Sequence, residues 1–155
     1  VAFAGPAEPI LAVENRFIPG PTADLPVRIY RPTEDKKSPA LIYFHGGGWV
    51  LNFLDIYDAA LHRLANQSGS VIISVNYQKA PEHPFPVPFD DCYSSLLWVK
   101  AHAKELGIDA ARVGAGTAVG GVLSGCFPDV GGEWPHLTPA CEDQAAITPV
   151  AALDT

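Results

Sequence analysis

The sequence predicts an α/β fold in which a mostly parallel sheet is flanked by helices, and three observations lead to it. Two unbroken apolar runs, residues 41–44 and 71–75, are typical of strands that are covered on both faces. A segment with helical spacing lies between them, and a longer one follows the second run. Because helices that alternate with buried strands build parallel sheets, we expect the two runs to be neighbouring interior strands.

The first half of the chain contains three further predicted elements. Residues 10–17 and 27–30 are predicted strands, and the turn between them is rich in proline and glycine. The first helix is predicted to cover residues 57–66. Gly69 lies just beyond its end, at the place where glycine commonly terminates a helix.

A longer helix is predicted after a loop punctuated by prolines. Asp90 or Asp91 can cap its start, and Gly107 marks its end. A short apolar piece at residues 112–115 then predicts the last strand. The helix is expected to turn one stripe of residues toward the core, namely Tyr93, Leu96, Leu97, Lys100, Ala103 and Leu106.

The composition indicates one globular domain. The chain has 155 residues, and its 48% hydrophobic and 17% charged residues suit a packed core. A formal net charge of −7 gives no electrostatic footprint for nucleic acid, and no apolar run reaches the roughly 18 residues of a membrane span. Three cysteines without metal-ligand spacing favour a reducing, cytoplasmic location. We therefore expect no nucleic-acid partner, no membrane span and no bound metal.

The character of the chain changes near residue 114. Residues 1–113 hold 10 basic and 12 acidic residues, whereas residues 114–155 hold 5 acidic residues and no basic one. The second part is also rich in glycine and proline. We therefore expect residues 1–113 to form the N-terminal part of a domain, and residues 114–155 to form an irregular acidic tail. The chain contains no methionine, which indicates a fragment or a processed chain.

Three consecutive glycines follow the first buried strand, in the segment His45-Gly46-Gly47-Gly48. Glycines allow a sharp turn and leave backbone N–H groups unshielded, so that these groups can stabilise an oxyanion during acyl transfer. One such donor contributes about 3 kcal/mol in enzymes that use it. The alternative is a tight turn without a ligand. A phosphate-binding loop is disfavoured, because the sequence has neither of the usual phosphate-loop motifs.

A second motif follows the second buried strand, from Tyr77 to Pro86. Together with the glycine segment, it resembles the hormone-sensitive-lipase-like family of α/β-hydrolases, which includes carboxylesterases. Asp58 also matches an acidic position of that family, and the resemblance covers the chain from about Val13 to Arg112. The matching positions of the second motif are Tyr77, Ala80, Pro81, Glu82, Phe85, Pro86 and Asp90.

This resemblance implies a partial α/β-hydrolase fold, incomplete on its C-terminal side. It also implies hydrolysis of small carboxylic esters through a serine acyl-enzyme, with no cofactor. Gly46, Gly47 and Gly48 would form the oxyanion hole, and His45 would support their loop. A sheet that lacks later strands would leave an exposed edge, so we also expect self-association.

The departures from the family motifs concern the catalytic residues. Asn52 stands where the family has glycine, and Gln78-Lys79 replaces Arg-Leu. The family's Gly-Asp-Ser-Ala-Gly-Gly is expected at residues 116–121, where alignment of the last two glycines places Ala118 at the nucleophile position. Alanine has no oxygen that could attack an ester. The neighbouring Thr117 is displaced by one position.

The acid and the base of a catalytic triad are not identifiable either. Ser124 is not in a Gly-x-Ser-x-Gly frame, and His136, the only histidine after residue 118, has the setting of a surface residue. Two hypotheses therefore stay open: a serine esterase, and a non-catalytic relative that is truncated, frame-shifted or a binding fragment. The genetic code permits a frame shift, because GGG-ACA-GCG encodes Gly116-Thr117-Ala118 and contains the Asp-Ser codons GAC-AGC in another frame.

Overall fold

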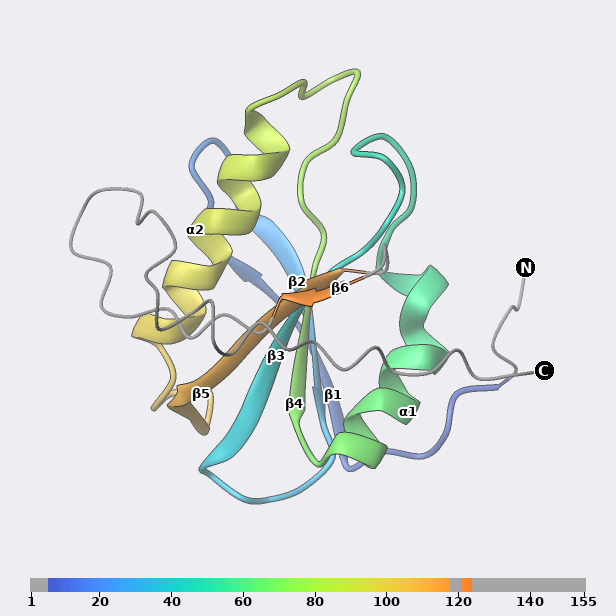
Figure 1. Ribbon diagram of the computed structural model, residues 1–155, viewed down its shortest axis with the longest axis vertical. Coiled ribbons are helices and arrows are strands. Elements are labelled where there is room, and N and C mark those ends of the chain that lie inside the picture. Colours follow the sequence, from blue (N-terminus) through green and yellow to red (C-terminus); the bar gives the residue numbers. More distant parts are fainter. Residues whose placement is uncertain (1–5, 118–120, 124–155) are drawn as a thin grey trace.

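The computed structural model describes residues 6–117 and 121–123 of the chain (Figure 1). The strands form one six-stranded sheet in the order β1-β2-β4-β3-β5-β6. Their bounds are β1 (Ala12–Ile18), β2 (Leu25–Arg31), β3 (Ser38–Phe44), β4 (Val71–Val75), β5 (Ile108–Thr117) and β6 (Gly121–Leu123).

The two buried apolar runs are neighbouring interior strands, as predicted. β3 and β4 pair in parallel, and β5 runs parallel to β3 on its other side. β2 is antiparallel to both β1 and β4, and β6 is antiparallel to β5. The α/β architecture is therefore confirmed, but the described sheet is mixed, because an antiparallel N-terminal hairpin flanks the parallel centre.

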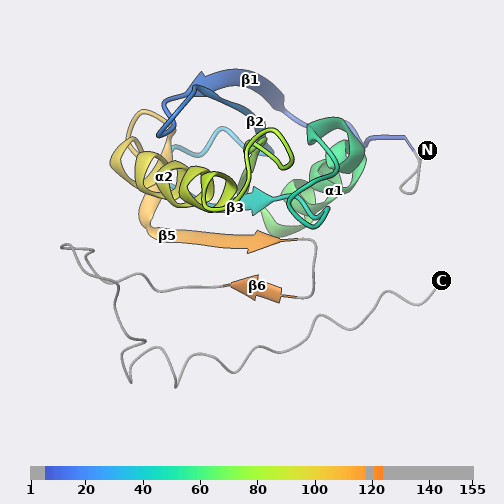
Figure 2. The same ribbon diagram turned by 90° about the horizontal axis from the view of Figure 1, so that it is seen from above.

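The two helices cover opposite faces of the sheet (Figure 2). A short 3-10 helix, η1 (Leu54–Tyr57), leads into α1 (Asp58–Ser68), and Gly69 ends α1 in a left-handed conformation, as predicted. The predicted acidic cap of the second helix is wrong: α2 (Val87–Ala101) begins after Pro86, and turns lead from its end to Gly107. Pro88 lies in the first turn of α2, where a proline fits because it has no N–H group to satisfy.

The core has one apolar layer on each side of the sheet. Between the sheet and α2 lie Ile42, Ile73 and Val99 among others. On the α1 side a smaller cluster includes Leu61 and Ile72. Full burial of one such side chain contributes about 1.5–3 kcal/mol. These layers fix the positions of β3 and β4, whose carboxyl ends carry the candidate site.

Two details of burial differ from expectation. Every residue of β4 is buried, but β3 alternates between buried and half-buried residues, because it lies at the margin of α1. On α2, Tyr93 and Leu97 are 41% and 38% exposed, and Val99 is buried in their place. The periodicity predicted the helix, but the buried face of the helix is rotated about its axis relative to the predicted stripe.

The described structure continues past residue 114. β5 reaches Thr117, and β6 is a strand that no sequence pattern predicted. The catalytic candidates Ala118, Ser124 and His136 lie outside the described residues. Within residues 6–117 and 121–123, no helix has the length and apolar character needed to cross a membrane.

Candidate functional site

The glycine segment forms a tight turn at the carboxyl end of β3. The N–H groups of Val50 and Leu51 both donate to the carbonyl oxygen of Gly47, at 3.2 and 3.0 Å. Gly47 has φ 139°, and a Cβ atom added to it would collide with the carbonyl oxygen of Leu51. This position therefore admits only glycine.

Gly48 is required for its backbone conformation and not for lack of space. Its φ is 62°, and a Cβ atom placed on it would meet no other described residue within 4 Å, its two chain neighbours aside. Trp49 and Asn52 also have positive φ, at 66° and 77°. Left-handed residues other than glycine cost on the order of 1–3 kcal/mol each, so surrounding contacts must hold this turn in place.

Asn52 makes some of those contacts. Its side-chain amide donates to the carbonyl oxygen of Gly46 at 2.8 Å and to the hydroxyl of Tyr57 at 3.2 Å. The family resemblance has glycine at this position, and the positive φ explains why. Asparagine enters the left-handed region more readily than most residues, and here its amide also closes the turn.

His45 is the buried residue at which the turn begins, with 2% of its surface exposed. Its Nδ1 lies 3.0 Å from the carbonyl oxygen of Gly46, which can only accept, so Nδ1 carries the proton. Burial lowers the pKa of His45, and the charge of Lys79 lowers it further, whereas hydrogen bonds to Gly46 and Asn76 act in the opposite direction. His45 is therefore a neutral imidazole at neutral pH, which suits a residue that organises a loop.

The loop after β4 is attached to this turn at two points. The hydroxyl of Tyr77 donates to the carbonyl oxygen of His45 at 2.5 Å, and the two rings stack with centroids 4.4 Å apart. The N–H of Ala80 donates to the carbonyl oxygen of Trp49 at 3.0 Å. Tyr77 is buried, whereas Trp49 is 48% exposed.

A buried carboxylate anchors the same loop to α2, and it belongs to Asp91. The backbone N–H of Gln78 donates to Asp91 Oδ2 at 2.8 Å, and the Gln78 side chain donates to the same carboxylate. Sequence matching selected Asp90 for the family position, but Asp90 is exposed. Helical spacing could have identified the right acid, because Asp91 shares one face with the buried Ser95 and Val99.

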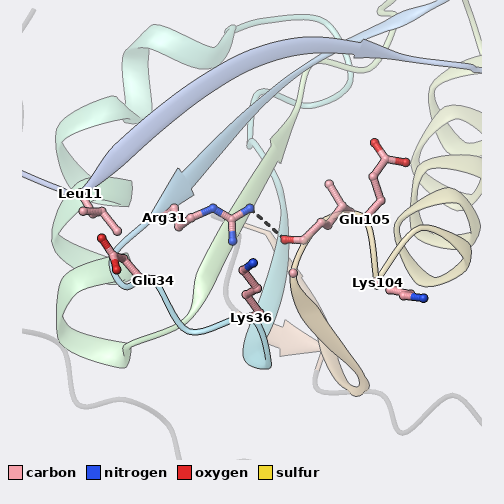
Figure 3. A pocket seen from close by; sticks show the side chains of 8 residues that line it. Leu11, Arg31, Glu34, Lys36, Lys104 and Glu105 are labelled. Atoms are coloured by element: carbon pink, nitrogen blue, oxygen red, sulfur yellow. Dashed lines mark hydrogen bonds between the residues drawn. The ribbon is translucent and has the colours of Figure 1, made fainter.

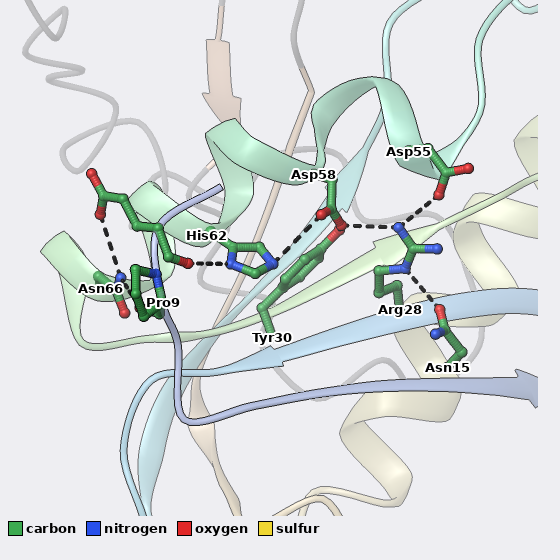
Figure 4. A network of polar contacts seen from close by, with 9 residues as sticks. Pro9, Asn15, Arg28, Tyr30, Asp55, Asp58, His62 and Asn66 are labelled. Carbon is green, nitrogen blue, oxygen red and sulfur yellow. Dashed lines mark hydrogen bonds and ion pairs between the residues drawn. The ribbon is translucent and has the colours of Figure 1, made fainter. Parts of the chain in front are cut away.

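Asp58, the other acid that matches the family, has a structural role at the start of α1 (Figure 4). It accepts hydrogen bonds from the hydroxyl of Tyr30 and from Arg28, both at 2.9 Å. Arg28 also contacts Asp55, at 2.8 Å. Burial and the nearby Asp58 raise the pKa of Tyr30, so its hydroxyl keeps its proton. This network attaches the segment that follows the glycine turn to β2.

The sheet register brings the end of β5 beside the turn. Phe44, which precedes His45, is paired with Thr117, the last residue of β5. The chain therefore leaves β5 next to the point where the glycine segment leaves β3. Gly46, Gly47 and Gly48 follow the end of β3 at this point, whereas Ala118 is not among the described residues.

Other candidate features lie apart from this site or lack reactivity. A pocket of about 500 Å³ opens at the opposite end of β3 and is lined by charges of both signs, including Arg31, Glu34 and Lys36 (Figure 3). Burial raises the pKa of the Cys92 thiol to about 12, so this cysteine is not a nucleophile at neutral pH. No group of three potential metal ligands occurs in the part of the chain that the structure describes.

Comparison with known proteins places this geometry in a family. The family model described as "alpha/beta hydrolase fold" matches residues 41–133. The chain is a member of the hormone-sensitive-lipase-like family of α/β-hydrolases. The matched range extends past Arg112, where the sequence resemblance was expected to end, so residues 114–121 fall inside it.

Several relatives of this chain are esterases. It is 40% identical over 132 residues to carboxylesterase NlhH of Mycobacterium tuberculosis, a match that covers 80% of this chain and 41% of NlhH. It is 35% identical over 124 residues to an arylesterase of Saccharolobus solfataricus, covering 79% and 40%. The crystallised esterase of Pyrobaculum calidifontis superposes with a TM-score of 0.70 at 41% identity, covering 71% and 36%. The lineage is therefore that of carboxylic ester hydrolases, and the chain spans about 40% of the length of these relatives.

Proposed function

We propose that this chain carries the oxyanion-binding part of a carboxylic ester hydrolase that acts on small esters through a serine acyl-enzyme. The backbone N–H groups of Gly47 and Gly48 would stabilise the oxyanion, Gly46 would complete their turn, and His45 would support the loop. Ester hydrolysis through a serine needs a nucleophile, a base and oxyanion donors. The glycine turn can supply only the last of these.

The register between β3 and β5 is the observation that carries this proposal. It sets Thr117, the last residue of β5, beside Phe44, which comes directly before the glycine segment. A nucleophile in this fold occupies a sharp turn between a strand and a helix.

A chimera tests the proposed oxyanion role directly. Residues 6–117 would be joined to the part of the Pyrobaculum calidifontis esterase that follows its equivalent strand. We expect the chimera to hydrolyse p-nitrophenyl butyrate. Replacing one oxyanion-hole donor lowers kcat about 10²–10³-fold in a well-studied protease. Replacing Gly48 by glycolic acid, which removes the N–H and leaves the backbone free to adopt φ 62°, should have a comparable effect here. A folded chimera without activity would contradict the proposal.

The chain as printed favours the second hypothesis, a non-catalytic relative, for its own turnover. The alignment places Ala118 at the nucleophile position, and alanine cannot form an acyl-enzyme. Codons 113–121 of the gene would decide the origin of this residue. A Gly-x-Ser-x-Gly sequence in another frame, followed by more family-like sequence, would identify a frame shift, and its absence would exclude one.

We also propose that the chain associates with copies of itself and that it is located in the cytoplasm. β1 lies at one edge of the sheet, and two of its apolar residues, Val13 and Phe17, are 40% and 69% exposed. Exposed edge strands with apolar side chains favour association with other chains. Analytical ultracentrifugation is expected to show oligomers that increase with concentration, and Phe17→Lys is expected to reduce them. A monodisperse monomer at every concentration would contradict this expectation.

A further inference from the structure

Lys79 takes the place of a leucine in the family motif, and its ammonium group turns back onto the start of its own loop. Nζ of Lys79 donates to Oδ1 of Asn76 at 2.8 Å and to the carbonyl oxygen of Tyr77 at 2.7 Å. It also lies 5.0 Å from the centroid of the Tyr77 ring, a distance at which a cation is attracted by an aromatic face. A leucine could make none of these three contacts.

Tyr77 connects this ammonium group to the glycine turn. Its ring stacks on the ring of His45, and its hydroxyl holds the carbonyl oxygen of His45. The next residue after Lys79, Ala80, bonds to Trp49 at the far side of the same turn. Any displacement of the Lys79 segment would therefore reach the turn at two points.

We propose that Lys79 is a positioning residue of the oxyanion loop: its ammonium group fixes Tyr77 against His45, and Tyr77 in turn fixes the backbone from which Gly46, Gly47 and Gly48 follow. The proposal deepens the proposed function, on which it rests for the role of the loop. Lys79 itself need not touch a substrate, since it acts through Tyr77.

The charges around His45 agree with this arrangement. Tyr57 stacks beyond His45 at 6.3 Å, and Tyr77 and Lys79 face it from the loop after β4. The positive charge of Lys79 contributes to the lowered pKa of His45, although burial contributes most. Burial lowers the pKa of Lys79, and the nearby Asp91 on α2 acts in the opposite direction. The positive charge of Lys79 favours the neutral form of His45.

NMR spectroscopy of the chain tests this role without any need for catalysis. Lys79→Met removes the charge and keeps most of the side-chain length, whereas Lys79→Arg keeps a charged donor. We expect Lys79→Met to raise the pKa of His45 and to shift the amide signals of Gly46, Gly47 and Gly48. Lys79→Arg is expected to restore both, and Lys104→Met, at an exposed lysine far from the turn, is expected to change neither.

A measurement on the unmodified chain covers the case in which Lys79→Met does not fold. The bonded ammonium group of Lys79 should give a long-lived ¹⁵Nζ signal, while those of the exposed Lys36, Lys37 and Lys104 exchange rapidly with water. An ammonium signal that exchanges as fast as theirs would overturn the proposal. So would a folded Lys79→Met chain in which the His45 titration and the glycine amide signals are unchanged. Neither outcome depends on whether the chimera described above hydrolyses an ester.

Discussion

The two ends of strand β3 are built on opposite principles. At its amino end the chain is open: Lys36 and Lys37 are exposed, and the nearby pocket has charges of both signs. At its carboxyl end, His45 is buried, several residues in succession have positive φ, and two loops are bonded to each other. The amino end only connects β2 to β3, whereas the carboxyl end holds a strained backbone in one conformation. Strain that is kept in place by surrounding contacts is typical of functional sites.

The largest expected difference between the ends concerns their glycines. Gly47→Ala adds a Cβ atom that collides with Leu51 at a φ suited only to glycine, and should cost about 3 kcal/mol of unfolding free energy. Gly107→Ala, at the amino end, also places alanine at a positive φ but meets only ordinary contacts, and should cost about 1 kcal/mol. Urea denaturation of both variants measures these costs. Equal losses would remove the distinction between the two ends.

A smaller difference is expected from the loss of one hydroxyl group at each end. Tyr77→Phe leaves the buried carbonyl oxygen of His45 without that donor, and should cost about 1–2 kcal/mol. Thr33→Val, at the amino end, removes a hydroxyl that lies 3.3 Å from Ser38 Oγ, and should change stability by about 0.5 kcal/mol or less. Thermal and urea unfolding would be compared with the unmodified chain, and a neutral Tyr77→Phe would show that the hydroxyl does not hold the turn.

The smallest expected effect is a dependence of stability on pH. Burial lowers the pKa of His45 below its ordinary value of 6.5, so the unfolded chain takes up this proton first as the pH falls. The contribution of neutral His45 to the stability of the folded chain is therefore complete above about pH 6.5, and it declines as the pH falls below that value. At the amino end of β5, Arg112 lowers the pKa of the partly exposed Asp109, whose contribution to stability declines only as the pH falls below 3.8.

Urea unfolding at pH 5.0 and 7.5 should reveal this dependence. It should be weaker in His45→Gln and unchanged in His83→Gln, which alters an exposed loop residue. A dependence that survives in His45→Gln would have to come from another group.

Sequence patterns predicted the parts of the fold that follow from burial and periodicity. The apolar runs of β3 and β4 and the glycine that ends α1 are confirmed, because each depends on a local property of the chain. The antiparallel pairing of β2 with β4 could not be read in this way, because it depends on long-range contacts. The predicted start of α2 was wrong because an acidic pair resembles a helix cap. The Asp91 carboxylate instead accepts a hydrogen bond from the backbone N–H of Gln78.

The candidate site shows the same division. The glycine segment indicated the turn, and the second motif indicated its supporting loop. Their connection through Tyr77 and Ala80 became visible only in three dimensions, since the two segments are about thirty residues apart. The position of Ala118 at the nucleophile and the division of the chain near residue 114 stay predictions.

We predict that this chain has an esterase-type oxyanion loop and that Ala118, aligned with the nucleophile position, leaves it unable to form an acyl-enzyme. Incubation with a fluorophosphonate probe, followed by mass spectrometry, and an assay with p-nitrophenyl butyrate test it most directly. We expect no labelled residue and no turnover above that of a matched protein control. Stoichiometric labelling of Thr117 or Ser124, with turnover abolished by substitution of the labelled residue, would contradict the claim and establish the chain as an active esterase.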